Sequence, residues 1–303
     1  MSTATEPGTT ARDRRLAFLV GDRLLPGAVT GGLWLWGALN IALVVWIAAT
    51  SLKTSKDIFA HPFSVPLDSQ WDNFSRAWST AGFGQAFLNT ALVAVVAAVL
   101  GVVVAAPAAY ALSRSRRRLS ASVTFLFALG MSIPHQALLV PYYFGNVELT
   151  RLMVDWVTGW WDPRVSLTLA YVVMSLPFTV FVLTGYFRGL PAELEEAAAL
   201  DGATGFTAFR RVMLPVSMSG LRTVLVINLI GLWNETLLVL LLIQDSDRRT
   251  LGASLLNFYG SMQYTADWAG LFAGIVIVVF PMLALYAWLS RHIVEGMTAG
   301  IGK

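Results

Sequence analysis

Two long stretches without a charged residue constrain the fold of this chain more than any other feature. No charged residue occurs between Arg23 and Lys53, and none occurs from Ala77 to Ser113. A helix that crosses the hydrocarbon core of a membrane needs about 20 mostly apolar residues. The sequence therefore predicts an all-α integral membrane protein. Its 13% of charged residues agrees with that class, since soluble domains carry about 25%.

Six segments meet this length requirement and predict six transmembrane helices. They cover residues 29–49, 85–112, 122–144, 165–187, 221–243 and 268–290. The first segment is too long for a cleaved signal peptide and lacks a small-residue cleavage site. We therefore expect an N-terminal tail (1–28), a six-helix transmembrane domain (29–290) and a C-terminal tail (291–303).

The basic residues are divided unevenly between the two sides of such a bundle. With the N-terminus in the cytoplasm, that side receives 14 of the 21 Lys and Arg residues, and the short loop 114–118 is the clearest anchor. Because cytoplasmic loops are enriched in Lys and Arg, both termini are predicted to be cytoplasmic. The loop 188–220, between the fourth and fifth helices, then lies on the same side.

Five prolines fall inside the predicted helices: Pro107, Pro134, Pro141, Pro177 and Pro281. Each removes a backbone hydrogen bond and tends to kink its helix. In a membrane the freed carbonyl must be satisfied by neighbouring helices or by a water-lined cavity. Singly these prolines indicate ordinary kinks, and together they favour a bundle that encloses a pathway.

The loop 188–220 carries signals for a first short helix. Pro191 suits an initial helical turn, and Glu193, Glu195 and Glu196 lie near the positive end of the helix dipole. Gly202 suits a helix C-terminus that needs left-handed backbone.

A second short helix is predicted to follow in the same loop. Thr204 can cap it, Phe206, Phe209 and Met213 fall on one side of it, and Pro215 is expected to end it. Two such helices suit a stiff element that docks on a partner outside the bilayer. The pattern alone equally suits an amphipathic helix that rests on lipid headgroups.

Residues in this loop resemble the EAA signature of ABC importer permeases. Glu196-Ala197-Ala198 is followed at the family's spacing by Gly202, Val212 and Leu214-Pro215, and only Val212 departs from it, standing in place of Ile. The resemblance implies a coupling helix that docks on a cytoplasmic ATPase, with ATP and magnesium bound by that ATPase and no cofactor bound by this chain. The implied coupling residues are Glu196, Ala197, Ala198, Asp201, Gly202, Phe206, Phe209, Leu214 and Pro215.

Other stretches resemble the carbohydrate-uptake branch of these importers, in particular its smaller, maltose-permease-type subunit. They are Asn89-Thr90, the run Ala109-Tyr110-Ala111-Leu112-Ser113-Arg114, Met131-Ser132-Ile133-Pro134, Trp233-Asn234-Glu235, Asp247-Arg248-Arg249-Thr250-Leu251 and the tail that begins at Val294. The likeness runs from about Phe87 to the end of the chain. It implies a multi-pass protein of the bacterial plasma membrane, paired with a second permease in a heterodimer. The further partners implied are an ATPase dimer, an extracytoplasmic solute-binding protein, a sugar and membrane lipid.

Two regions depart from that branch. The chain ends Gly300-Ile301-Gly302-Lys303, unlike the family's common ending, so a contact of the tail with the ATPase is less well supported than the contact of the loop. The segment 145–164 has no close match. Its tryptophans, Trp156, Trp160 and Trp161, suit an outer interfacial belt or a platform on which a sugar stacks.

Glu235 is the one charged residue deep inside a predicted helix. An ionisable group there is costly unless it faces the interior of the bundle. With Asn228, Trp233 and Asn234 it could form a sugar pathway, because sugar hydroxyls need planar polar groups and sugar rings pack on aromatic faces. The alternative is a polar contact that locks this chain to the second permease.

Several chemistries find no support in the sequence. There is no cysteine, and the three histidines lie far apart, so no metal site is expected. The net charge of +3 does not indicate nucleic acid. The tail lacks the glycine spacing of a phosphate-binding loop. No cluster of acid, base and nucleophile suggests a membrane enzyme.

The leading hypothesis is therefore one transmembrane half of an ATP-driven importer for a di- or oligosaccharide. The residues 245–267, between the fifth and sixth helices, are expected to form an outer polar loop that faces the solute-binding protein or merely connects the helices. The alternative function is a secondary transporter driven by an ion gradient, which predicts intramembrane carboxylates and internal inverted repeats. The chain offers one such carboxylate and no visible repeat.

Overall fold

The computed structural model describes residues 25–66, 68–115 and 118–299. All of its regular elements are helices, which confirms the predicted all-helical class for the described residues. The predicted N-terminal tail up to residue 24, part of the loop 114–118 and the tail 300–303 lie outside the described residues. The long helices are α2 (Leu25–Thr50), α5 (Phe83–Arg114), α8 (Pro163–Arg188), α12 (Met218–Asn234) and α15 (Trp268–Ala299).

Shorter helices connect these five and close both ends of the bundle. They are α3 (Ser55–Ala60), α4 (Asp72–Ala81), α6 (Arg118–Gly130), η2 (His135–Leu138), α7 (Leu139–Met153), η3 (Val154–Thr158), α9 (Glu193–Leu200), α10 (Gly205–Ala208), η4 (Phe209–Met213), α11 (Leu214–Val216), α13 (Leu237–Leu242), η5 (Ser246–Arg248) and α14 (Leu251–Thr265).

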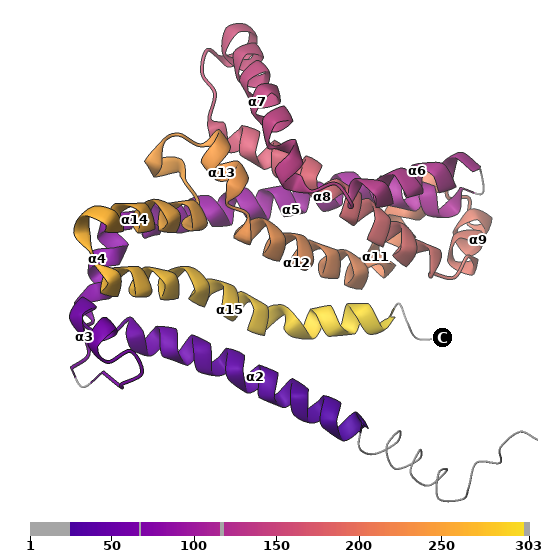
Figure 1. The fold of residues 1–303 in the computed structure, drawn as a ribbon. Coiled ribbons are helices and arrows are strands. Elements are labelled where there is room, and N and C mark those ends of the chain that lie inside the picture. The colour runs from indigo at the N-terminus through magenta and orange to yellow at the C-terminus, as the bar shows by residue number, and fades with distance from the viewer. Residues whose placement is uncertain (1–24, 67, 116–117, 300–303) are drawn as a thin grey trace, which may run out of the picture.

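The long helices run alongside one another, α6 lies beside α8, and α7 projects away from the bundle (Figure 1). The start of α2, the end of α15 and the helices α9 and α11 lie at one end, whereas α3, α4 and α14 lie at the other. The predicted coupling loop and the two ends of the described chain are therefore on the same side of the bundle. The arginine distribution remains the basis for calling this side cytoplasmic.

Within the described residues, four helices are long and apolar enough to cross a membrane, and the number reaches six if each of two bent pairs counts as one span. Four predicted spans are found close to their expected bounds, as α2, α5, α8 and α15. The first helix begins at Leu25, inside the predicted tail. The last continues to Ala299, through the part predicted as C-terminal tail.

The third predicted span is wrong as a single helix. The chain leaves helix α6 at Gly130, and residues 120–130 and 135–157 are bent by 93° relative to each other. Pro134 explains the break, because its ring disfavours helical backbone at Ile133 and it supplies no backbone N–H. Pro107, Pro177 and Pro281 lie inside continuous helices, so the position of a proline did not by itself predict a break.

The fifth predicted span is also interrupted. Helix α12 ends at Asn234, Glu235 has extended backbone, and α13 begins at Leu237. The polar loop predicted at 245–267 is largely helical as well, since α14 occupies Leu251–Thr265. Helix α14 packs against α15, α5 and α4, so this segment is more than an irregular connector.

Helices α5 and α8 form the most extensive contact of the bundle. The side of α5 that faces the bundle is built from small residues, including Ala97, Ala105 and Ala109, all fully buried. Small residues allow membrane helices to approach closely. At Gly101 the approach is so close that an added Cβ would lie 2.8 Å from Oγ of Ser175.

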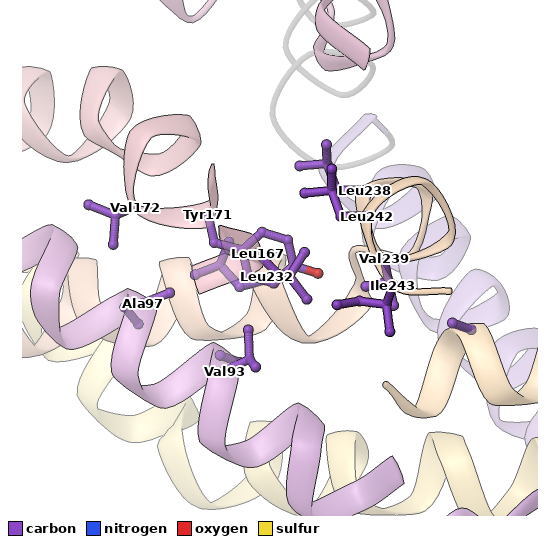
Figure 2. Packing of buried hydrophobic residues seen from close by; sticks show 13 residues of the cluster. Val93, Ala97, Leu167, Tyr171, Val172, Leu232, Leu238, Val239, Leu242 and Ile243 are labelled. Carbon is purple, nitrogen blue, oxygen red and sulfur yellow. The ribbon is translucent and has the colours of Figure 1, made fainter. Parts of the chain in front are cut away.

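One apolar cluster joins the middle of this pair to the interrupted fifth span (Figure 2). Val93 of α5, Tyr171 of α8, Leu232 of α12 and Val239 of α13 meet there and are almost fully buried. The cluster holds α13 against the rest of the bundle despite the break in the chain before it.

Candidate functional sites

The predicted coupling loop folds as a helix, a tight turn and a second helix. Helix α9 ends at Leu200, and Gly202 follows in left-handed backbone with a φ of 78°. The turn is closed by a hydrogen bond of 2.9 Å from the N–H of Ala203 to the carbonyl of Ala198. The left-handed position predicted for Gly202 is confirmed. Residues other than glycine reach this backbone only with strain.

The second helix starts as predicted and then departs from the expected pattern. Oγ1 of Thr204 accepts a hydrogen bond of 3.3 Å from the N–H of Thr207, which confirms the cap. The three apolar side chains predicted on one side differ in burial: Phe206 is 70% exposed, whereas Phe209 and Met213 are buried. Phe206 and Phe209 nevertheless line one apolar groove beside α5. From Phe209 to Met213 the chain forms the π-helix η4, a wider turn that the α-helical period does not predict.

The end of this second helix also differs from the prediction. Pro215 lies one residue before the end of the helical run 205–216, which continues from α10 through η4 and α11. The chain bends by 73° only after Val216, where the coupling loop passes into α12. Pro215 therefore belongs to the helix that it was expected to end.

The last residues of helix α5 contact the coupling loop and hold it in place. Nε of Arg114 lies 2.5 Å from Oε1 of Glu195 on α9, and Nη2 of Arg114 donates to the carbonyl of Leu190 at 3.3 Å. The Tyr110 ring packs against Phe209 at a centroid distance of 5.0 Å. In the sequence, residues 109–114 are notable only for their resemblance to the family; in the structure, Tyr110 and Arg114 help to position the loop.

The predicted coupling residues divide into an exposed group and a buried group. Phe209 and Ala198 are buried and Leu214 is half-buried. The exposed group comprises Glu196, Ala197, Asp201, Gly202, Phe206 and Pro215. Leu200, which the sequence pattern does not single out, is 89% exposed at the end of α9. Leu200 and Phe206 are the two largely exposed large apolar side chains of the coupling loop, and we call them the apolar tip.

The four polar and aromatic residues predicted inside the fifth span do not form one cluster. Nδ2 of the buried Asn228 donates to Oγ1 of Thr179 on α8 at 2.8 Å. The Trp233 ring meets Phe87 of α5 edge-on at 5.7 Å. Asn234 is exposed and donates to the carbonyl of Ile230 in its own helix. Within the described chain, none of the four side chains hydrogen-bonds to another of the four.

Glu235 occupies the break between α12 and α13. Its carboxylate accepts hydrogen bonds from the backbone N–H groups of Leu237 at 2.9 Å and Leu238 at 3.1 Å. The hydroxyl of Tyr171 lies 3.2 Å from both the backbone oxygen and Oε2 of Glu235. A carboxylate at the N-terminus of a helix satisfies N–H groups that the helix leaves free. Glu235 therefore stabilises the break from within this chain.

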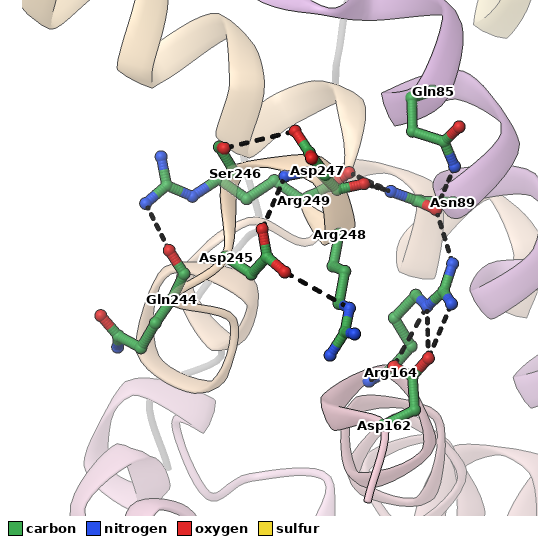
Figure 3. A network of polar contacts seen from close by, with 10 residues as sticks. All are labelled: Gln85, Asn89, Asp162, Arg164, Gln244, Asp245, Ser246, Asp247, Arg248 and Arg249. Atoms are coloured by element: carbon green, nitrogen blue, oxygen red, sulfur yellow. Dashed lines mark hydrogen bonds and ion pairs between the residues drawn. The ribbon is translucent and has the colours of Figure 1, made fainter.

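A second polar network lies at the end of the bundle away from the coupling loop and joins the start of α5 to the segment 244–249 (Figure 3). Asn89 of α5 is 1% exposed, and its Nδ2 donates to the carbonyls of Asp247 at 2.8 Å and Arg249 at 3.0 Å. Its Oδ1 accepts from Nη1 of Arg164 at 3.0 Å and from Nε2 of Gln85 at 3.2 Å. All four contacts of the amide are therefore made within the chain.

The neighbours of Asn89 extend this outer network. Oγ1 of Thr90 accepts from the N–H of Leu251 at 2.8 Å, so the two family-like stretches 89–90 and 247–251 are packed together. Arg164 forms an ion pair of 2.6 Å with Asp162. Hydrogen bonds from Arg164 hold the pKa of the Asp162 carboxyl below its usual range.

Comparisons with known proteins agree in pointing to one class of membrane protein. Residues 97–299 match the family described as binding-protein-dependent transport system inner membrane component. The chain is 35% identical to the diacetylchitobiose uptake system permease protein NgcG of Streptomyces coelicolor, over 88% of this chain and 85% of that protein. It is 30% identical to the trehalose transport system permease protein SugB of Mycobacterium tuberculosis, over 86% and 91% of the respective chains.

A solved structure shares the fold. The crystal structure of a bacterial ABC transporter involved in the import of the acidic polysaccharide alginate contains a chain that matches with a TM-score of 0.71. The match covers 94% of this chain and 99% of that chain at 21% sequence identity.

Proposed function

Because the chain belongs to the family of binding-protein-dependent transport system inner membrane components, we propose that it is a permease subunit of an ABC importer for sugars. Relatives along most of its length are permeases for diacetylchitobiose and trehalose, which supports a di- or oligosaccharide as the substrate. The chain is a multi-pass protein of the inner membrane, and it forms half of the translocation pathway together with a second permease.

The alternative of an ion-gradient-driven transporter has lost its main support. That hypothesis relied on Glu235 as an intramembrane carboxylate, and this group is hydrogen-bonded to two backbone N–H groups of α13. No observation on the described residues favours it over the family assignment.

One observation supports coupling through this loop: the apolar tip is exposed, whereas the rest of the loop is fixed to α5. Leu200 and Phe206 are exposed, whereas the loop beneath them is fixed to α5 by the Arg114–Glu195 ion pair and by packing of Tyr110 on Phe209. An exposed apolar patch on a rigid base is typical of a protein–protein contact. We assign it to a cytoplasmic ATPase, which would bind the ATP and magnesium and perform hydrolysis.

The coupling proposal is tested by changing the tip and leaving its support intact. In a complex purified through a tag on this chain, Leu200→Asp should reduce the copurified ATPase at least tenfold, because a charge replaces the apolar contact. Leu200→Met is the matched control and should keep the ATPase, since it preserves an apolar side chain of similar size. ATPase recovery in the Asp variant equal to that of the wild type would refute docking at this tip.

The other partners follow from the two ends of the bundle. The end built by α4, α14 and the loop 245–249 is the proposed face for an extracytoplasmic solute-binding protein. ATP hydrolysis measured across a panel of sugars with their binding proteins identifies the substrate, since the correct pair should stimulate hydrolysis.

Asn228, Trp233, Asn234 and Glu235 remain candidates for the sugar pathway. Glu235→Ala removes the carboxylate that caps α13, and it should change substrate-stimulated transport if this region lines the path. Gly231→Ala on the same helix is the control, since an added Cβ there meets nothing within 4 Å, and it should transport like the wild type. Unchanged transport with weaker pairing to the second permease would instead support the polar-lock interpretation.

A further inference from the structure

An apolar groove lies between α5 and the segment that joins the coupling loop to α12. It has a volume of about 480 Å³, within the range of about 300 to 1,000 Å³ for small-molecule sites. Its walls include Val99 and Val103 of α5, Leu214 of α11, and Met218 and Leu225 of α12. Sugars need several hydrogen-bonding groups around them, whereas the polar side chains that line this groove are two arginines and the other lining residues are apolar. The groove therefore does not suit a neutral sugar as the transported substrate.

Two arginines stand at the edge of this apolar groove. Arg210 of η4 and Arg222 of α12 both line it, and both side chains are exposed. In the described part of the chain neither guanidinium has a hydrogen-bond or ion-pair partner. Two unpaired guanidinium groups beside an apolar wall suit a ligand with an anionic group, which the arginines bind, and an apolar part, which packs against the wall.

The position of the groove along the bundle selects the ligand. The lining of α5 runs from Val99 to Pro107, roughly 12 Å of helix at 1.5 Å per residue. The arginines lie toward the coupling loop, on the side that the charge distribution predicts to be cytoplasmic. Basic pockets between transmembrane helices on that side suit lipid headgroups, and guanidinium groups bind phosphate through paired hydrogen bonds.

We propose that this groove binds an anionic phospholipid. One acyl chain lies along α5 against Val99 and Val103, and the phosphate is bound between Arg210 and Arg222. The side chain of Phe206, one of the two residues of the apolar tip, also lines the groove. A lipid bound there contacts the coupling loop directly and favours its observed position.

The proposal is tested by lipid binding to the full chain with the subunits that copurify with it. Native mass spectrometry of the delipidated complex measures its affinity for dioleoylphosphatidylglycerol, with dioleoylphosphatidylcholine as the neutral-headgroup comparison. Each arginine near an anionic surface accounts for roughly a five-fold effect. The double variant Arg210→Gln, Arg222→Gln should therefore bind phosphatidylglycerol about 25-fold more weakly. Arg211→Gln is the matched control: it lies on the same π-helix, does not line the groove and should bind within two-fold of the wild type.

A second variant separates the groove from general attraction of lipid to a basic surface. Val103→Trp fills the groove and keeps both arginines, and it should weaken phosphatidylglycerol binding at least ten-fold. Unchanged binding in the double arginine variant or in Val103→Trp would overturn the proposal.

The competing occupant is a helix of the second permease. The chain contains no cysteine, so a nitroxide on Val103→Cys reports the surroundings of that position in the assembled complex. High accessibility to oxygen is expected for a lipid-filled groove. A label shielded from oxygen by protein would show that the partner subunit covers the groove, and would also overturn the proposal.

Discussion

The two ends of helix α5 differ in whether the residues around them are buried within the chain or exposed. At one end, Asn89 is buried, and its amide is consumed by four hydrogen bonds to Gln85, Arg164, Asp247 and Arg249. At the other end, Arg114 braces a loop that still presents Leu200 and Phe206 to the surroundings. The Asn89 amide at the centre of the outer network is fully bonded within the chain, so we call this the closed end. The coupling loop is fixed to α5 on one side and exposes Leu200 and Phe206, so we call this the open end.

This difference separates residues that maintain the fold from residues that are available to partners. A buried amide with every group bonded contributes to stability, because unbonded polar groups in the interior are costly. An exposed leucine contributes nothing to the isolated chain, and its burial by a partner yields free energy on binding. Changes at the outer network should therefore alter stability, and changes at the coupling loop should alter assembly and transport.

The largest expected effect comes from Gly202→Val at the open end. A β-branched residue at a φ of 78° is strained and should distort the turn between α9 and α10. Transport by the assembled complex should fall at least ten-fold, with normal insertion of the chain into the membrane. Gly205→Ala is the matched control, since an added Cβ there meets nothing within 4 Å and its backbone is not left-handed. Wild-type transport by Gly202→Val would contradict a coupling role for the turn.

The next effect is expected from Asn89→Leu at the closed end. The carbonyls of Asp247 and Arg249 lose their donor, so thermal unfolding in detergent should show a loss of about 3 kcal/mol, at about 1–3 kcal/mol for each buried polar group left unpaired. Asn257→Ala, an exposed position on α14, should change stability by less than about 0.5 kcal/mol. If both variants unfold at the same temperature, the outer network is not a stabilising element.

The smallest effect is expected from removing the ion pair between Arg114 of α5 and Glu195 of α9. The Arg114 and Glu195 side chains are each 23% exposed, so their ion pair should contribute about 1 kcal/mol, near the upper end for accessible pairs. A double-mutant cycle with Arg114→Ala and Glu195→Ala measures that coupling by thermal unfolding. The single variants should also weaken recovery of the ATPase with the complex. A coupling energy of zero would mean that the ion pair does not position the loop, and would leave the Arg114–Leu190 hydrogen bond and the packing of Tyr110 on Phe209 to do so.

The sequence by itself determined the membrane class, four of the helices and the local form of the coupling loop. Hydropathy over 20 residues depends only on composition, and the left-handed Gly202 and the Thr204 cap depend on backbone preferences over a few residues. Such short-range terms are present in the sequence before any packing is known. The EAA pattern added the family and the expected role of the loop.

Only the tertiary structure decided which residues meet. The break at Glu235 is held by Tyr171, 64 residues earlier in the chain, and Asn89 bonds to carbonyls about 160 residues away. Residues 209–213 form a π-helix that the 3.6-residue period does not predict. These outcomes depend on packing between helices that are distant in sequence, and local preference contains no information on that packing.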